Sequence, residues 1–161
     1  MFWRERIEEK KEVTPDELLE RFKEAAGDPG SLYDNVLEYL EPYMAKAILT
    51  TNADAITKAE AIYSFGDLMG AYRELLTIYR WFAGFVSQYP EGGFFKKDME
   101  DIVTVTRDVT KEVIEVYSNI KKVGTLDVII FRFWQLASKL DHHIDVFVIH
   151  LLKYIAGLRS S

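Results

Sequence analysis

The sequence predicts an all-α fold, a single-domain bundle of four to five helices with long antiparallel helices and a buried C-terminal helix. Three features support this prediction. Two long segments place apolar residues at alternating steps of three and four, the spacing of a packed helix face. Proline and glycine interrupt the chain at only a few points, so the helical segments are long and the connections short. No sequence repeat or internal linker divides the chain, which favours one domain.

The N-terminal residues are expected to form a charged arm over 1–13, outside a helical bundle domain that covers 14–161. Between residues 4 and 12 every position except Ile7 is charged, with both signs mixed. Such a segment has no apolar stripe with which to pack, so we expect the arm to be either disordered or loosely helical.

The first two helices follow the arm. The first begins at Thr14, whose hydroxyl can cap it, while Pro15 suits the first turn and Glu17 completes a capping box. The second is expected to begin at Ser31. Pro42 lies within this second helix and has no N–H to donate, so we expect a kink or a restart there.

The third helix is expected over 54–89 and carries an apolar seam. The seam consists of Ile62, Phe65, Met69, Tyr72, Leu76, Tyr79, Ala83 and Val86. Gly66 and Gly70 interrupt the helix. A glycine in a helix interior lowers its stability, so we expect these two either to permit the close approach of another backbone, which we favour, or to mark a bend.

The fourth helix is expected over 96–122. Its seam consists of Met99, Ile102, Thr106, Val109, Val113, Val116, Ile120 and Val123. The run 102–106 is β-branched throughout and could form a strand instead. The seam continues unbroken through this run, which favours a helix. Gly124 ends the fourth helix and Thr125 is expected to cap the next.

The last helix, over 125–159, has a main apolar face that runs along its whole length. That face consists of Leu126, Ile129, Ile130, Phe133, Leu136, Ala137, Leu140, Ile144, Phe147, Val148, Leu151, Ile155 and Leu158. Up to Asp141 the opposite side is mixed and wettable, but Val146, Ile149 and Leu152 then add a second apolar surface. We therefore expect this part of the helix to be covered on two sides, by the bundle or by a second chain. Charged residues keep its apolar run shorter than the ~20 residues of a membrane span, so none is expected.

Composition narrows the classes of function. The 161 residues include no cysteine, which excludes disulfides, thiolate metal sites and cysteine nucleophiles and fits a reducing compartment, the cytoplasm. The formal net charge is −6 and no segment is strongly basic, so direct nucleic-acid binding is not expected. Few amide side chains and many charged ones are typical of thermophilic proteins.

All three histidines lie in the last helix. His143 and His150 are seven residues apart and therefore share one side, where they could ligate a metal if another helix supplied carboxylates. Arg132 and Lys139 lie in the same sector and would oppose a cation, and His142 points elsewhere. No Glu-x-x-His sequence occurs, so a di-iron site of the ferritin kind is not expected.

The favoured prediction is a non-enzymatic α-helical module for protein–protein interaction or assembly, as a homo-oligomer and in its simplest form a dimer. No catalytic residue and no cofactor is predicted. The interface candidates are Trp81, Trp134, Val146, Ile149 and Leu152, the tryptophans because they fall off the apolar seams. One alternative is a metal-binding helical-bundle enzyme that uses His143 and His150. A further alternative is a small helical subunit of a nucleoprotein or viral assembly.

Overall fold

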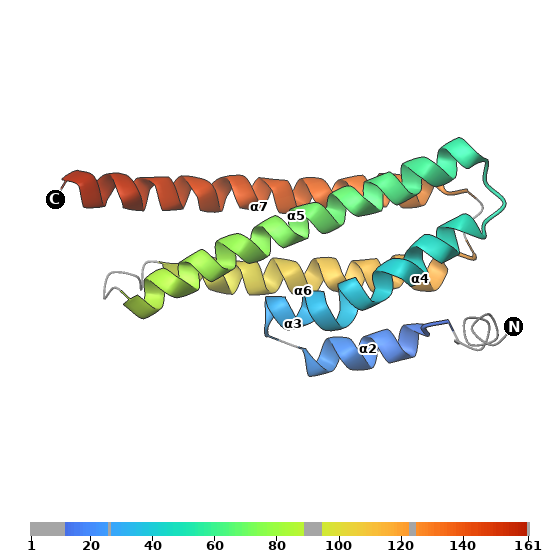
Figure 1. Ribbon diagram of the computed structural model, residues 1–161, viewed down its shortest axis with the longest axis horizontal. Helices are drawn as coiled ribbons and strands as arrows, with labels where there is room; N and C mark the ends of the chain where they lie inside the picture. Colours follow the sequence, from blue (N-terminus) through green and yellow to red (C-terminus); the bar gives the residue numbers. More distant parts are fainter. Residues whose placement is uncertain (1–11, 26, 89–94, 123–124, 161) are drawn as a thin grey trace, which may run out of the picture.

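A computed structural model of the chain describes residues 12–25, 27–88, 95–122 and 125–160, without the side chains of 158–160. The helical elements are α2 (Pro15–Glu24), α3 (Pro29–Leu32), the π-helical turn η1 (Tyr33–Leu37), α4 (Glu38–Leu49), α5 (Ala55–Gln88), α6 (Lys96–Asn119) and α7 (Asp127–Ser160). Because α3, η1 and α4 follow one another without a break, the described residues form five helical rods, and no strand occurs among them (Figure 1). The predicted all-α bundle is confirmed.

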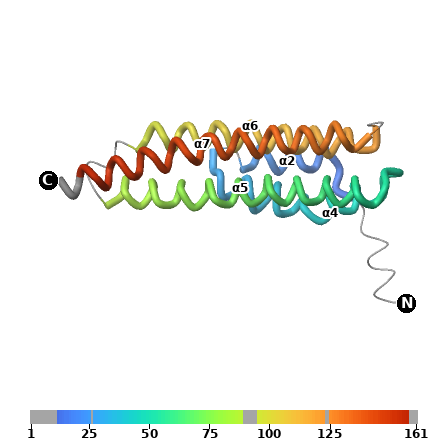
Figure 2. Tube along the Cα trace, turned by 90° about the horizontal axis from the view of Figure 1, so that it is seen from above, coloured from blue at the N-terminus to red at the C-terminus, as the bar shows by residue number. Residues whose placement is uncertain are grey.

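The helices are arranged so that each rod runs antiparallel to the next one in the chain (Figure 1). The helices α5 and α7 extend along nearly the whole molecule and α6 along most of it, whereas α2 and the rod α3–η1–α4 cover only one half (Figure 2). We call that half the five-helix end and the other half, built by α5, α6 and α7, the three-helix end. The most extensive packing joins α5 to α7, which run in the same direction. The three-helix end therefore has fewer neighbours to cover its apolar side chains.

Two of the predicted helix caps are present. The Thr14 hydroxyl accepts a hydrogen bond from the Glu17 N–H at 3.2 Å, and the Thr125 hydroxyl accepts one from the Asp127 N–H at 3.2 Å. The predicted capping box is half formed, because the Glu17 carboxylate accepts from the Tyr39 hydroxyl at 3.1 Å, on the neighbouring rod. The Glu17 side chain thus links two helices and also places a negative charge at the N-terminus of α2, where the helix dipole favours it.

The second helix begins earlier than predicted. Asp28, not Ser31, is its cap: one carboxylate oxygen accepts from the Gly30 N–H at 3.0 Å and the other from the Ser31 hydroxyl at 2.9 Å. The sequence prediction overlooked Asp28 because Pro29 follows it, although proline is favoured in a first turn. Further along, α4 runs through Pro42 without the predicted restart.

The glycines of α5 do not mark a close contact. A Cβ atom built on Gly66 or on Gly70 would have no neighbouring heavy atom within 4 Å, leaving aside the adjacent residues and the backbone of the same helix. The expected close approach of another backbone at these two positions is therefore wrong. Gly66 is exposed and Gly70 half-buried, so both lie toward the outer side of α5.

The central helix of the bundle is α6, which packs against α5 and α7 on one side and against α2 and α3 on the other. Its buried residues are Asp98, Ile102, Val105, Thr106, Val109, Thr110, Val113, Ile114 and Tyr117. The run 102–106, for which a strand was the alternative, lies within this helix. The predicted helix is confirmed.

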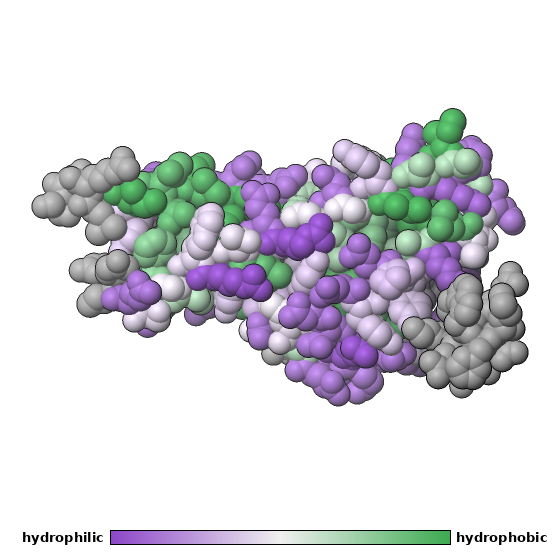
Figure 3. All heavy atoms as spheres, in the orientation of Figure 1, coloured by the Kyte–Doolittle hydropathy of each residue, from purple (hydrophilic) through white to green (hydrophobic). Residues whose placement is uncertain are grey.

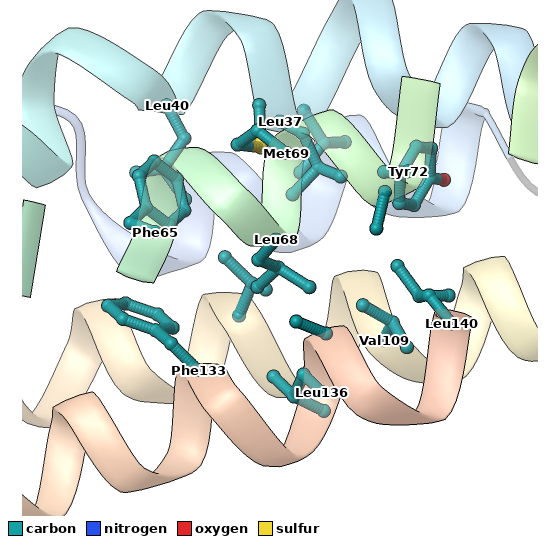
Figure 4. Close-up of a cluster of buried hydrophobic side chains, with 14 of the residues drawn as sticks. Leu37, Leu40, Phe65, Leu68, Met69, Tyr72, Val109, Phe133, Leu136 and Leu140 are labelled. Atoms are coloured by element: carbon teal, nitrogen blue, oxygen red, sulfur yellow. The ribbon is translucent and has the colours of Figure 1, made fainter. Parts of the chain in front are cut away.

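The core is densest where all the rods meet, around α5. Figure 4 shows Phe65, Leu68, Met69 and Tyr72 of α5 between Leu37 and Leu40 on one side and Val109, Phe133, Leu136 and Leu140 on the other. The Tyr72 hydroxyl lies 3.3 Å from the Thr110 hydroxyl, which gives this buried polar group a partner. Burial raises the pKa of Tyr72 to about 12, so it stays protonated there.

Two residues of the predicted N-terminal arm are described, and they contact α6 and the turn that follows it. Val13 is buried, and its carbonyl accepts a hydrogen bond from the Tyr117 hydroxyl at 2.8 Å. Glu12 forms an exposed ion pair with Lys121 at 2.8 Å, and this pair lowers the pKa of Glu12. The end of the arm is thus tied to the bundle, while residues 1–11 lie outside the described residues and their order stays a prediction.

Candidate functional site

Apart from the half-buried Ile130, the predicted main face of α7 is buried as far as Phe147, and beyond it the described residues of that face are half-buried. The buried residues are Leu126, just before the helix, and Ile129, Phe133, Leu136, Ala137, Leu140, Ile144 and Phe147. They are covered by α5 and α6, with Phe133 against Phe65 at 5.2 Å between ring centroids. Within the described part of the chain, no helix combines the length and apolar character that crossing a membrane requires.

The described residues of this chain leave the second apolar surface of α7 open. The exposed fraction is 49% for Ile149 and 59% for Leu152, and Val146 is half-buried. The expectation of cover on two sides is therefore not met within one copy. Trp81 is 51% exposed and neighbours Phe82, whose ring meets that of Phe147 at 6.0 Å, so Trp81 lies at the same three-helix end.

A second exposed apolar group lies at the start of α7, which sequence reasoning treated as wettable. Val128 and Phe131 are 59% and 63% exposed. Trp134, 41% exposed, lies beside them with its ring 6.3 Å from that of the exposed Tyr63 on α5. The signal was present in the sequence, because Val128 and Phe131 stand three heptads before Ile149 and Leu152 and so share their side of the helix.

These residues belong to one continuous stripe, which we call the outer seam of α7. It alternates by three and four through Val128, Phe131, Gln135, Ser138, His142, Asp145, Ile149, Leu152 and Ala156, and every one of them is exposed. The seam is apolar toward both ends and polar in the middle. Figure 3 shows hydrophobic surface over the C-terminal part of α7 and hydrophilic surface next to it, toward the middle of the molecule.

A groove of about 310 Å³ borders the start of the outer seam, between α6 and α7. Its walls include Val116 of α6 and Val128 and Phe131 of α7, so part of its lining is apolar. Arg132 and Glu112, which also line it, form an ion pair that joins the two helices. The surface beside Val128 and Phe131 is therefore concave and can receive a side chain from outside.

The histidines are separated by their partners. His150 Nδ1 lies 2.9 Å from Asp98 Oδ1, and Asp98 is buried, so this pair ties the C-terminal part of α7 to the start of α6. His143 stacks on Phe147 at 5.9 Å between centroids. Burial lowers the pKa of His143, and the charges of His142 and Lys139 lower it further.

The metal candidates His143 and His150 thus have different surroundings, one aromatic and one carboxylate. Among the described residues, no group of three or more histidine, cysteine or acidic side chains could hold a metal ion. Asp145, which stood out in the sequence because apolar residues flank it, is exposed, as is His142. Burial raises the pKa of Asp141, and the charges of Asp67 and Asp145 raise it further.

The chain was compared with protein families, with curated proteins and with solved structures, and none of the three comparisons finds a match. Function must therefore be argued from the outer seam and its surroundings.

Proposed function

We propose that this chain is a non-enzymatic α-helical assembly module that associates with copies of itself through the outer seam of α7. One observation carries the proposal. Four large apolar side chains, Val128, Phe131, Ile149 and Leu152, are each about half exposed or more along a single helix face. Exposed apolar patches of this kind on a folded domain mark sites of interaction.

The free energy available for association comes from the outer seam as a whole. Fully burying a Val, Leu, Ile or Phe side chain contributes about 1.5–3 kcal/mol, so each half-exposed side chain of the seam contributes roughly 1 kcal/mol when a partner covers it. The contribution of one residue is too small to offset the free energy that association costs in lost translational and rotational freedom. Trp134, beside the seam, and Trp81 at the three-helix end add aromatic surface of the type enriched at interfaces.

The distribution of charge over the surface, unlike the net charge, permits contact between like chains. The chain carries a net charge of −6, so two copies repel each other at long range. The seam itself includes one acid, Asp145, and one histidine, His142, which leaves it low in charge compared with the rest of the surface. Since the sequence lacks cysteine, we place this assembly in a reducing compartment, the cytoplasm.

The test compares two leucine-to-glutamate variants by sedimentation velocity. Leu152→Glu introduces a charge at the seam, and Leu49→Glu introduces the same charge on α4 at nearly the same exposure, 55% against 59%. We expect Leu152→Glu to sediment as a monomer with an unchanged circular dichroism spectrum, and Leu49→Glu to assemble like the parent chain. Equal assembly of all three proteins would overturn the proposed interface.

A further inference from the structure

The outer seam has a polarity pattern that is the same when it is followed in either direction. The positions symmetric about residue 140 are Val128 with Leu152, Phe131 with Ile149, Gln135 with Asp145, and Ser138 with His142. Apolar residues therefore correspond to apolar residues, and polar residues correspond to polar residues. A surface that matches its own reverse is suited to an isologous contact between two copies.

We propose that two copies pair their α7 helices antiparallel, seam against seam, about a twofold axis at the level of residue 140. This inference rests on the proposed self-association and specifies its geometry. The axis passes between Ser138 and His142, so each copy places its Val128 and Phe131 against Leu152 and Ile149 of the second copy. From Val128 to Leu152 the paired helices extend over about 36 Å at 1.5 Å per residue.

The packing follows the rule for antiparallel helix pairs. A seam with steps of three and four has two alternating kinds of position, which face each other across an antiparallel pair. Val128 and Leu152 are of opposite kinds, as are Phe131 and Ile149, so the symmetric pairs meet this requirement. The groove of about 310 Å³ that Val128 and Phe131 help to line lies where the second copy brings Leu152. A preformed hollow at that point favours close packing of the apolar ends.

The polar residues in the middle of the seam favour an antiparallel over a parallel pairing of the two α7 helices. In the antiparallel pair the Gln135 amide can donate to the Asp145 carboxylate, and the Ser138 hydroxyl faces the His142 ring. In a parallel pair each residue faces the same residue of the second copy, which places Asp145 against Asp145 and His142 against His142. Like groups brought together in this way, with water excluded, are destabilising.

The same residues also select the register. A shift of one heptad in the antiparallel pair would set Leu152 against Gln135 and Ile149 against Ser138, and so bury polar groups against apolar ones. Beside the axis, Lys139 and Asp141 lie on opposite margins of the seam. Lys139 faces Lys139 of the second copy, and Asp141 faces Asp141 of the second copy. Both are exposed, so solvent and salt screen these contacts and they add little.

Cysteine cross-linking tests this geometry, because the chain contains no cysteine of its own. The variants are Gln135→Cys, Asp145→Cys and the double variant Gln135→Cys/Asp145→Cys, all at exposed polar positions, with Thr104→Cys on the exposed side of α6 as the control. In the antiparallel pair, identical positions lie about 15 Å apart along the helix, well beyond the ~7 Å limit between the Cα atoms of a disulfide. We therefore expect mild oxidation to cross-link the double variant into dimers and to leave both single variants and the control uncross-linked.

Other results would overturn the geometry. Cross-linking of each single variant indicates a parallel pair, and cross-linking of Thr104→Cys to the same extent indicates random collision. A double variant that sediments as a dimer without cross-linking indicates that another surface is used, while self-association itself stands. If the parent chain sediments as a monomer, the proposed function fails, and the geometry with it.

Discussion

Replacing Phe82 with alanine removes the side chain around which the three-helix end is packed. Phe82 has no exposed surface, although it lies outside the apolar seam that the sequence predicted for α5. Its ring stacks on Phe95, at the start of α6, with 4.5 Å between centroids, and it meets Phe147 of α7 edge-on at 6.0 Å. One side chain thus joins all three helices of this end.

The expected loss follows from these contacts. Truncating a buried phenylalanine to alanine costs about 3–5 kcal/mol, and each aromatic pair contributes about 0.5–1.5 kcal/mol beyond its buried area. Both ring contacts disappear in Phe82→Ala, so we expect a loss in the upper part of the first range. For a chain of this size 1 kcal/mol corresponds to about 2–4 °C, which predicts a fall in Tm of about 8–20 °C.

The assay is urea unfolding followed by circular dichroism. Parent and variants are compared at one protein concentration, because self-association adds a concentration-dependent term to stability. Ile56→Ala is the control on the same helix, since Ile56 is 74% exposed and its truncation should change stability by less than about 0.5 kcal/mol. A loss below about 1 kcal/mol for Phe82→Ala would refute the packing described for the three-helix end.

Three further substitutions test the electrostatics and the tertiary links. The folded-state pKa of Asp141 is raised by burial and neighbouring acids, so its contribution to stability is present below the ordinary value of 3.8 and is lost as pH rises through the folded pKa. Asp141→Asn should therefore raise Tm at neutral pH and change little at about pH 2.5, as measured by differential scanning fluorimetry. Tyr117→Phe removes the hydrogen bond to the Val13 carbonyl and should lower the free energy of unfolding by about 1 kcal/mol, measured in urea. His150→Ala removes a partner of the buried Asp98 carboxylate and should cost about 1–3 kcal/mol, but distinctly less in an Asp98→Asn background, which a double-mutant cycle checks.

The helices could be predicted because their signals are local. The seam through α6 and the caps at Thr14 and Thr125 depend on residues within one or two turns of each other. The burial of α6 on both sides could not be predicted in the same way, because Thr110, outside the predicted seam, is polar and buried, as is Thr106 within it. The structure shows how they are accommodated: each hydroxyl donates to a carbonyl one turn earlier, Thr106 to Ile102 at 2.7 Å and Thr110 to Thr106 at 2.6 Å.

The candidate surface was predicted in part, for a related reason. An apolar helix face has the same spacing whether the same chain or a second chain covers it, so Ile149 and Leu152 could be identified but not placed. Val128 and Phe131 were missed because they alternate with Asp127 and Arg132, which made that side of the helix look wettable. Their exposure became evident only once α5 and α6 were seen to cover the opposite face.

The central claim is that the chain associates with itself through the outer seam of α7. The most direct test is the mass of the unmodified protein, determined by light scattering over a dilution series that starts at tens of micromolar. The account predicts twice the chain mass of 18.7 kDa at the highest concentration and a fall toward 18.7 kDa on dilution. A mass of 18.7 kDa at every concentration would contradict it.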